Sequence, residues 1–444
     1  MGGFPFRDVS PWVERPDDPA APLDADVTAD VVVVGGGYTG LSTALELRAA
    51  GIDVAVLEQG FAGSGASGRN AGHLTPTIGK DVPTLLALFG SERAEALVRF
   101  ADAAVRHTES KIAELGIDCD YVASGNVLAG VHPKQEKRLR AAAEAARSAG
   151  AHVRFLERDA MRERRIPPAF LFGIFEECGG TLHPGRYVTG LRRAALDAGV
   201  RLFEESPLAA LEEGARVVAR TSAGSVTADA AVMATNAYTG LTGFKKRAVA
   251  PLRVSLFETE ALDEQRLDAL AWPGREGIYT AHEVLESYRL TVAGTIVGGS
   301  KTVGQGYGTE LPPAWDPRAF RVIEDAYRQR FPEVGGAKVA HFWGGWIGLT
   351  LDFLPMVGTA GAHGNVHYGI GFCGHGVAQA TLAGAMLAER VAGRAHEWDT
   401  ALARREWSWP PEPLRFVGGR LLSGALEAWD RRTDRQIRRL ARSG

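Results

Sequence analysis

Short apolar runs that end in glycine-rich turns are the strongest pattern along the chain. Residues 30–34, DVVVV, predict a strand that is buried on both faces. The turn GGGYTG follows at 35–40, and apolar residues at helical spacing then predict a helix that ends at Gly51. Residues 53–58, DVAVLE, predict a second strand. Together these segments predict one compact βαβ unit.

The rest of the chain alternates between helical and strand periods. Apolar positions at helical spacing predict four more helices, at 91–116, 133–150, 185–198 and 317–331. Alternating or wholly apolar runs predict strands at 201–205, 216–221, 226–228, 230–235 and 366–370. Residues 250–305 alternate without a helical period and predict antiparallel sheet. The last strand leads through the glycine turn 371–376 into a helix that ends near Gly393.

Length and composition limit the class of protein. A chain of 444 residues that is 45% hydrophobic and 23% charged predicts two or three globular domains. Fifty Lys and Arg against 53 Asp and Glu leave a net charge of −3, which argues against nucleic-acid binding. The three cysteines lie far apart, which excludes a metal or disulfide pattern and indicates a reducing compartment. Without a signal peptide or a run of 18 apolar residues, we expect a soluble, cytoplasmic protein.

The first glycine turn has the spacing of a dinucleotide-binding fingerprint. Gly35 permits the tight turn, Gly37 lets a pyrophosphate approach the backbone, and Gly40 lets helix and strand pack closely. The helix that follows offers free N–H groups and a positive dipole end. Glu58, at the end of the second strand, can accept hydrogen bonds from a ribose hydroxyl and disfavours a 2′-phosphate. This fingerprint does not by itself separate NAD from FAD.

A second glycine-rich loop separates the two cofactors. Residues 63–73, GSGASGRNAGH, follow the second strand directly and are here called the flavin loop. An NAD enzyme has no need for such a loop, whereas FAD extends across the sheet and requires backbone close to its flavin. The glycines of 371–376 precede a helix, so its N–H groups can face the edge of a flavin that gains negative charge. Both loops favour FAD.

The same runs carry a family resemblance. GGGYTGLSTALELRAAGIDVAVLE and GASGRNAGH closely resemble the D-amino-acid-oxidase-like FAD oxidoreductases, also called the glycine/sarcosine oxidase superfamily. Three later runs are similar to the family's closing segments, namely VMATNAY at 232–238, WGGWIGLTLDFLPMVG at 343–358 and GIGFCGHGV at 369–377. The resemblance covers about 29–393, and within the family it is greatest to the gamma-glutamylputrescine oxidoreductase branch.

The resemblance implies an α/β fold with two domains. A Rossmann-like FAD-binding domain of the glutathione-reductase type would be joined by a mixed-sheet α+β substrate domain that covers the flavin. The implied boundaries are an N-terminal arm at 1–29, an FAD domain at 30–90, 181–250 and 335–400, a substrate domain at 91–180 and 251–334, and a basic amphipathic tail at 401–444.

The resemblance also implies the residues that bind FAD. They are Gly35, Gly37, Tyr38, Thr39, Gly40, Glu58, Gln59, Ser67, Gly68, Arg69, Asn70, Ala71, Gly72, Thr235, Asn236, Gly345, Gly371, Gly374, His375, Gly376 and Val377. The positions at which relatives link flavin covalently align with Gly345 and Asn70, and neither side chain can form that bond. Noncovalent FAD is therefore expected, and no metal site is predicted.

Four side chains are candidates for catalysis, each with a structural alternative. By resemblance, Lys301 lies near flavin N5 and assists the reaction with O₂; the alternative is a solvated lysine. Arg69 sits in the flavin loop, or else on the surface. His73 acts as a base or links flavin, unless it only bonds to backbone. Trp346 lines an amine pocket or packs in the core, and the same alternatives hold for Trp343, Tyr279, Tyr288 and Tyr307.

The implied reaction is oxidation of an amine at the C–H next to nitrogen. Hydride passes to flavin N5, the imine product leaves, and O₂ reoxidises the flavin to give H₂O₂. Ala378 replaces the lysine with which sarcosine oxidases hold the substrate carboxylate, which puts a small α-amino acid in doubt. The alternatives are a dehydrogenase that passes electrons to quinone and a flavin-bearing subunit of a larger complex. The tail contacts an anionic membrane or docks on its own domain.

Overall fold

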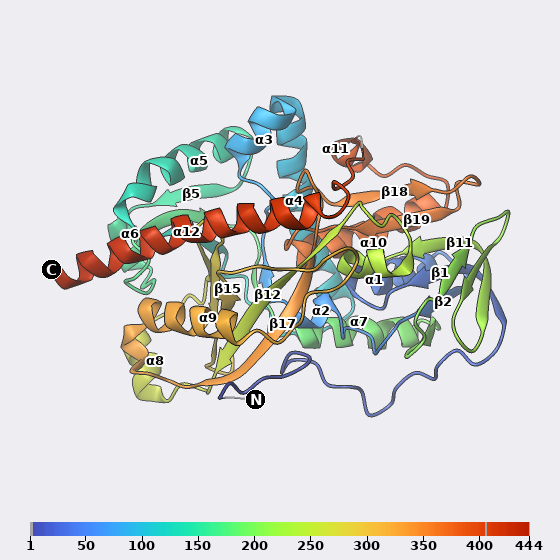
Figure 1. Ribbon diagram of the computed structural model, residues 1–444, viewed down its shortest axis with the longest axis horizontal. Coiled ribbons are helices and arrows are strands. Elements are labelled where there is room, and N and C mark those ends of the chain that lie inside the picture. Colours follow the sequence, from blue (N-terminus) through green and yellow to red (C-terminus); the bar gives the residue numbers. More distant parts are fainter. Residues whose placement is uncertain (1–2, 405, 444) are drawn as a thin grey trace.

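Two large sheets lie side by side along the long axis of the molecule (Figure 1). The computed structural model describes residues 3–404 and 406–443. Eight strands form the first sheet and nine the second, and a short pair, β3 (His73–Leu74) and β7 (Gly180–Thr181), lies apart from both. The α/β fold class with a Rossmann-like unit and a mixed sheet is confirmed.

The first sheet is built on parallel strands. Its order is β18-β19-β11-β1-β2-β8, with β10 and β9 attached to β11. The bounds are β1 (Val27–Val34), β2 (Val54–Leu57), β8 (Arg201–Phe203), β9 (Ala210–Glu212), β10 (Val217–Arg220), β11 (Ser225–Met233), β18 (Met356–Ala360) and β19 (Val366–Ile370). Strand β1 pairs in parallel with β2 and β11, and its last four valines are buried. The predicted βαβ unit is therefore confirmed.

Four helices pack together on the first sheet: α1 (Tyr38–Ala49), α4 (Ser91–Glu114), α7 (Pro184–Asp197) and α10 (Gly376–Val391). The residues of α4 that face inward belong to the same apolar core as those of α1 and α10. The boundary at 91 predicted from the sequence had assigned α4 to the substrate domain, so its packing corrects that prediction.

The second sheet is mixed. Its order is β16-β12-β15-β14-β13-β4-β6-β5. Strands β16 and β15 pair with successive parts of one edge of β12, and β17 pairs with its other edge. The bounds are β4 (Asn126–Gly130), β5 (Val153–Leu156), β6 (Phe172–Glu176), β12 (Ala250–Thr259), β13 (Gly277–Thr280), β14 (Glu286–Leu290), β15 (Ile296–Ser300), β16 (Gly304–Gln305) and β17 (Val339–Leu349). Strands β12 to β15 pair antiparallel, as the alternation over 250–305 predicts. Strand β17 joins this sheet, which corrects the prediction that the FAD domain resumes at 335.

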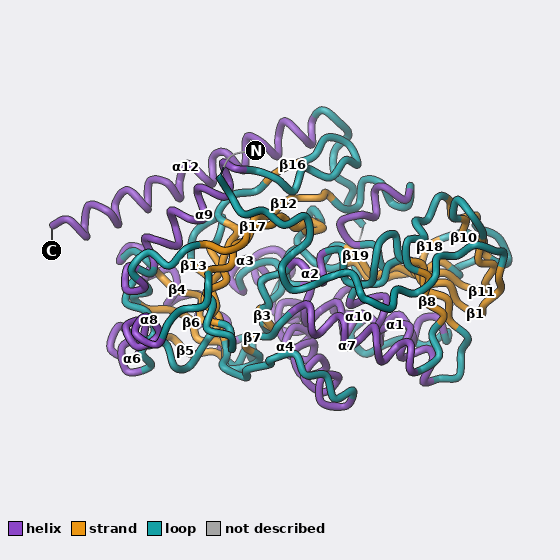
Figure 2. Tube along the Cα trace, turned by 90° about the horizontal axis from the view of Figure 1, so that it is seen from below, coloured by secondary structure: helices purple, strands orange, loops and turns teal. Residues whose placement is uncertain are grey.

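The remaining helices lie in the connections. They are α2 (Ala66–Arg69), α3 (Val82–Phe89), α5 (Glu136–Ser148), α6 (Arg158–Glu163), α8 (Glu264–Leu270), α9 (Pro317–Arg330), α11 (Asp399–Leu402) and the last helix, α12 (Leu414–Ser443). Figure 2 shows α12 along the outside of the second sheet, away from the first. Within the described ranges, no helix is both long and apolar enough to cross a membrane.

Candidate active site

A pocket runs from the glycine turn after β1 to the face of the second sheet. The flavin loop, the β11 end, β17 and the start of α10 all contribute to its walls. It contains most of the residues expected to bind FAD, including Glu58, Gln59, Thr235, Asn236 and Gly345. Segments that are far apart in the sequence therefore converge on one elongated site.

The turn after β1 leaves no space for side chains. Gly35 has a φ of +111°, and a Cβ there would lie 2.6 Å from the carbonyl oxygen of Ala234. A Cβ on Gly40 would overlap the carbonyl oxygen of Gly35. Gly37 caps α1 without a side-chain hydrogen bond. The N–H of Tyr38 donates to Ser67 Oγ, so the next N–H groups of the first turn, those of Thr39 and Gly40, are the ones that can face a pyrophosphate.

Glu58 connects the glycine turn after β1 to the segment that follows β2. Its carboxylate accepts hydrogen bonds from the N–H of Gly36 at 2.7 Å and the N–H of Gly60 at 2.9 Å. Burial raises the pKa of Glu58, against the opposing effect of these two bonds. The side chain thus shapes the nucleotide end of the pocket as well as offering oxygens to a ribose.

We expect Glu58→Ala to weaken FAD binding by about tenfold or more, because two buried N–H groups lose their acceptor. Glu58→Gln should weaken it less, since an amide retains one acceptor oxygen. Fluorescence titration of the apoprotein with FAD gives both dissociation constants. Equal FAD affinity in the wild type and both variants would contradict this role.

Side-chain hydrogen bonds hold the flavin loop in shape. Ser67 Oγ accepts from the N–H of Tyr38 at 2.9 Å. Asn70 Nδ2 donates to the carbonyl of Ser67 at 2.7 Å, and its Oδ1 accepts from the N–H of Gly72 at 2.9 Å. These contacts tie the loop to the start of α1 and leave its backbone facing the pocket. Asn70 is thus committed to the loop, consistent with noncovalent FAD.

Arg69 fixes the loop to β17. Its Nε donates to the carbonyl of Ser64 at 2.7 Å and its Nη1 to the carbonyl of Gly344 at 3.0 Å. The guanidinium also lies 5.0 Å from the centre of the Trp346 ring. Burial lowers the pKa of Arg69, and the side chain is 8% exposed. The surface alternative for Arg69 is wrong, and its Nε and Nη1 already have backbone partners.

The start of α10 forms the second electropositive wall. Gly371 and Gly374 have φ values of +73° and +90°, and Asn236 Oδ1 accepts from the N–H of Gly371 at 3.0 Å. His375 precedes the helix, and burial lowers its pKa to about 4, so the ring is neutral. The N-terminal end of this 16-residue helix therefore provides the positive dipole that suits a reduced flavin.

His73 lies in the wall of the pocket and has one ring nitrogen without a partner in the part of the chain that the structure describes. Its Nδ1 lies 3.3 Å from Asn126 Oδ1, and Asn126 Nδ2 donates to the carbonyl of Leu74 at 2.9 Å. Because the amide is oriented by that second bond, Nδ1 of His73 carries the proton and Nε2 is the acceptor. Burial lowers the pKa of His73 to about 4. The buried Nε2 has no partner among the described residues, and the ring lines the pocket.

The aromatic candidates divide into two groups. Trp346 and Tyr279 line the pocket, whereas Trp343 and Tyr288 are buried in the protein core and Tyr307 is 50% exposed. Tyr279 donates a hydrogen bond to Glu176, a buried carboxyl whose pKa burial raises to about 8. Sequence reasoning missed Glu176, because its position in a strand carries no motif.

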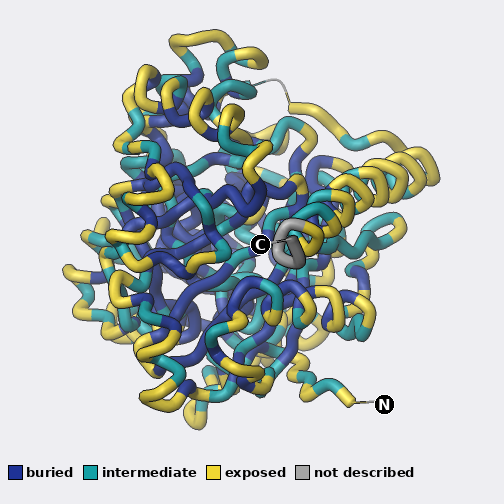
Figure 3. Tube along the Cα trace, turned by 90° about the vertical axis from the view of Figure 1, so that its left-hand side faces the viewer, coloured by how far each residue is buried: buried dark blue, intermediate teal, exposed yellow. Residues whose placement is uncertain are grey.

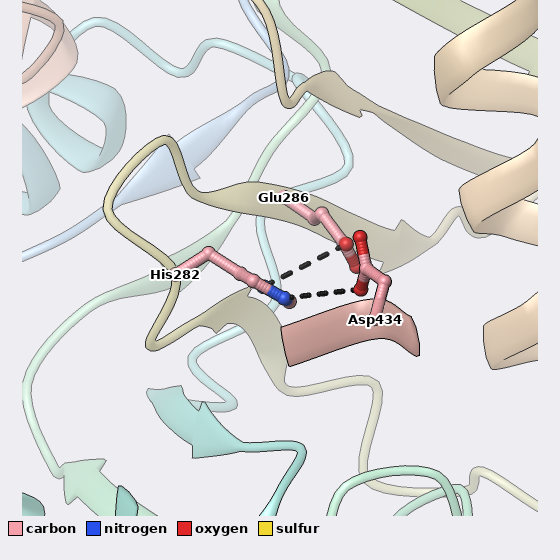
Figure 4. Close-up of side chains that lie close together, drawn as sticks. All are labelled: His282, Glu286 and Asp434. Atoms are coloured by element: carbon pink, nitrogen blue, oxygen red, sulfur yellow. Dashed lines mark ion pairs between the residues drawn. The ribbon is translucent and has the colours of Figure 1, made fainter. Parts of the chain in front are cut away.

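Lys301 does not reach the pocket. Its ammonium pairs with the carboxylate of Glu286 and lies 2.9 Å from Asp434 Oδ2. On β14, Ser287 faces the pocket, so the neighbouring Glu286 points to the opposite side of the sheet. Lys301 is therefore buried behind the second sheet, which corrects both its predicted place beside N5 and the solvated alternative. Figure 4 shows Glu286 and Asp434 meeting there with His282.

The pocket fits FAD in shape and chemistry. Two helix N-termini offer N–H donors, Glu58 offers acceptors, and the glycines leave room where side chains would fill the turn. A Cβ on Gly345 would lie 3.2 Å from the Cβ of Arg69, so β17 approaches the flavin loop closely. Burial raises the pKa of Cys373, the pocket thiol, to about 11, which keeps it protonated and poorly nucleophilic.

Comparison with known proteins identifies relatives over nearly the whole chain. Gamma-glutamylputrescine oxidoreductase of Escherichia coli (strain K12) is 32% identical over 404 residues, which are 90% of each chain. A probable oxidoreductase, OrdL, of Rhizobium meliloti (strain 1021) is 30% identical over 87% of this chain and 89% of its own.

Solved structures agree with the fold. Glycine oxidase from Geobacillus kaustophilus superposes with a TM-score of 0.73 at 21% identity, over 85% of this chain and 99% of its own. L-proline dehydrogenase from P. horikoshii gives 0.69 at 21% identity, over 89% and 99%. The family described as FAD dependent oxidoreductase (DAO) matches residues 30–390. The chain therefore belongs to this family, and it is an FAD-dependent oxidoreductase of the amine and amino-acid type.

Proposed function

We propose that the protein oxidises an amine whose reacting carbon carries no carboxylate. The amine would lose hydride from the carbon and a proton from the nitrogen to become an imine. FAD, when bound, supplies the two-electron acceptor for this step. The residues of the chain bind and orient the amine, exclude water and stabilise charge around the flavin.

The observation that carries the proposal is the lack of a carboxylate clamp. Among the described residues that line the pocket, Arg69 is the one lysine or arginine, and backbone carbonyls already engage it. Ala378, in α10, is a small buried residue. The end of the pocket near the second sheet is lined by uncharged groups, including His73, Leu256 and Ser287. A buried carboxylate there would lack a cationic partner among the lining residues, which is costly.

The name of the Escherichia coli relative supports the same class. Gamma-glutamylputrescine has a primary amine at one end, and its carboxylate lies at the far end of a long chain. Such a substrate would place only methylenes and the amine beside the flavin. We propose a substrate of this kind, an extended primary amine.

His73 is proposed as the group that orients the amine. A neutral amine reacts, and its N–H can donate to the unpartnered Nε2 of His73. A pKa of about 4 keeps that nitrogen unprotonated at neutral pH. The imidazole thus accepts a hydrogen bond without repelling the iminium charge that develops next to it.

A substrate panel tests the proposal. We expect kcat/KM for gamma-glutamylputrescine to exceed that for glycine or a D-amino acid by at least about 100-fold, because a carboxylate would be left unpaired. Anaerobic reduction of bound FAD by each compound measures the first half-reaction directly. Faster reduction by small α-amino acids than by any primary amine would overturn the proposal.

We expect His73→Leu to lower kcat/KM for the amine by up to about tenfold, because one hydrogen bond to the substrate is lost. FAD content should not change. His367→Leu is the control, since His367 is a buried histidine that bonds to Thr359 at 3.0 Å and lies outside the pocket lining. An unchanged kcat/KM in His73→Leu would show that His73 does not contact the amine and has a structural role alone.

The electron acceptor is proposed to be O₂. The three cysteines, Cys119, Cys178 and Cys373, lie apart in the sequence and form no iron–sulfur ligand pattern, which supports a diffusible acceptor. Stopped-flow reoxidation of the reduced enzyme by air or by a soluble quinone compares the two acceptors. Reoxidation by quinone but not by O₂ would show that the protein is a dehydrogenase and not an oxidase. The cytoplasmic location stays a prediction.

A further inference from the structure

Helix α12 carries an unusual share of the exposed apolar side chains. Leu414, Val417, Leu421, Leu422 and Trp429 are between 50% and 71% exposed. We call these five residues the outer face of α12. They recur at helical spacing and so project from one side of the helix. Figure 3 shows the exposed flank of this helix standing away from the body of the molecule.

The opposite side of α12 is firmly attached. Asp430 accepts hydrogen bonds from the N–H groups of Glu283 and Val284 at 2.9 and 2.8 Å. Ser423 accepts one from Gln305 at 3.2 Å. The outer face is therefore exposed because polar contacts fix the helix by its other side. The tail thus docks on its own domain, as one of the two sequence-based alternatives expects, but Leu421, Leu422 and Trp429 remain exposed.

A buried ionic cluster completes the attachment. We call His282, Glu286, Lys301, Arg330 and Asp434 the anchor cluster. Asp434, from α12, lies 2.9 Å from Lys301 Nζ, 3.1 Å from Arg330 Nη2 and 3.3 Å from His282 Nε2. Arg330 also donates to Glu286 at 2.8 Å.

The composition of the anchor cluster does not suit a metal ion. The imidazole and the two carboxylates do lie within 4.8 Å of one another (Figure 4). Lys301 and Arg330, however, already neutralise the two carboxylates and occupy their oxygens. The cluster holds α12 in place instead.

The exposed charged side chains around the outer face are positive. Arg420, Arg431, Arg432, Arg435 and Arg438 are exposed on α12. The acidic residues of the helix are turned away: Asp430 and Asp434 are buried, and the side chain of Glu427 is 22% exposed and lies 3.6 Å from Arg431. Apolar side chains with flanking arginines are the pattern of a helix that lies on an anionic membrane.

We propose that the outer face of α12 docks on the surface of an anionic lipid bilayer. Leucine and tryptophan side chains would enter the boundary between headgroups and acyl chains, and the arginines would contact lipid phosphates or carboxylates. A second copy of this chain fits less well, because neither orientation of paired helices brings carboxylates to the arginines. This inference does not depend on the proposed substrate.

Co-flotation of the FAD-loaded enzyme with vesicles tests the proposal. Vesicles of phosphatidylcholine with 30% phosphatidylglycerol should bind it at low salt, and pure phosphatidylcholine vesicles at least tenfold less. Binding to the anionic vesicles should fall several-fold when salt is raised to 0.5 M, because the arginine contacts are screened. Absence of binding to anionic vesicles at low salt would overturn the proposal.

Two variants separate specific docking from general stickiness. L421S/L422S should lower vesicle binding by at least tenfold and leave amine oxidation unchanged. The control L88S removes a leucine that is 59% exposed elsewhere and should bind as the wild type does. Equal losses in both variants, or none in L421S/L422S, would overturn the proposal. The proposal would also be overturned if light scattering showed a dimer that L421S/L422S dissociates and the enzyme did not bind vesicles.

Discussion

Gly40→Ala should yield a protein that no longer retains FAD. The added Cβ would overlap the carbonyl oxygen of Gly35, and both atoms belong to backbone that cannot rotate away. Helix α1 or the turn must move, and the N–H groups that face the pyrophosphate move with it. Purified wild type should carry close to one FAD per chain. We expect Gly40→Ala to carry less than about one tenth of that, a loss of about 1.4 kcal/mol or more in binding.

Gly424→Ala is the matched control for Gly40→Ala. Gly424 lies in α12, and a Cβ there would meet no atom within 4 Å. The same chemical change should therefore leave FAD content as it is and should not lower the unfolding temperature, because Ala favours a helix more than Gly does. FAD retention by Gly40→Ala within twofold of the wild type would show that the turn can relax, and the close-packing argument would fail.

The nucleotide end of the site could be predicted because its chemistry is local. The positions of Gly35, Gly37 and Gly40 follow from backbone geometry within one turn, and Glu58 follows from its place at the end of β2. These segments would meet a ligand mainly through their own backbone. A linear pattern is then sufficient to identify them.

The position of Lys301 could not be predicted, because it depends on distant partners. Lys301 immediately follows β15, and the strand that pairs with it turns Glu286 away from the pocket. Asp434, which lies 2.9 Å from the ammonium, comes from a helix more than a hundred residues later. Ser300, the residue before Lys301, lines the pocket, but the face to which a side chain points is set by register and by such partners.

Helix α12 shows the same limit. Its amphipathic pattern is plain in the sequence, and an amphipathic helix is usually expected to bury its apolar side. Here Asp430 and Asp434 face the protein, while Leu421 and Trp429 face outward. The partners of the two aspartates come from the turn between β13 and β14, from the residue after β15 and from α9, so they come together only in the folded chain.

The structure reverses the expected consequence of changing Lys301. If it stood beside flavin N5, Lys301→Met would slow reoxidation by O₂ and leave the fold intact. Because it pairs with Glu286 and Asp434, we expect a loss of about 3–5 kcal/mol in the free energy of unfolding. Both half-reactions of the folded fraction should change less than about twofold. Slower reoxidation at unchanged stability would restore the role beside the flavin.

A double-variant cycle identifies the cause of that loss. Asp434→Asn removes one of the two carboxylates, so Lys301→Met combined with Asp434→Asn restores the charge balance of the anchor cluster. We expect the double variant to be more stable than the sum of the two single losses predicts, by at least about 1 kcal/mol. Urea unfolding at pH 7 measures all four proteins. Strict additivity would mean that the ammonium and the carboxylate do not interact.

Acid should act on the same cluster with a definite sign. The cations around Glu286 lower its pKa to about 2, and they also lower the pKa of Asp434. A carboxyl whose pKa is lower in the folded state than in the unfolded chain stabilises the fold above its unfolded pKa, which is about 4.5 for Glu286 and 3.8 for Asp434. That contribution should disappear as the pH falls from about 4.5 towards 2. Because the double variant lacks one of these carboxylates, its free energy of unfolding should fall less steeply over this interval than that of the wild type. Equal slopes of the free energy of unfolding against pH would exclude the cluster as the acid-sensitive element.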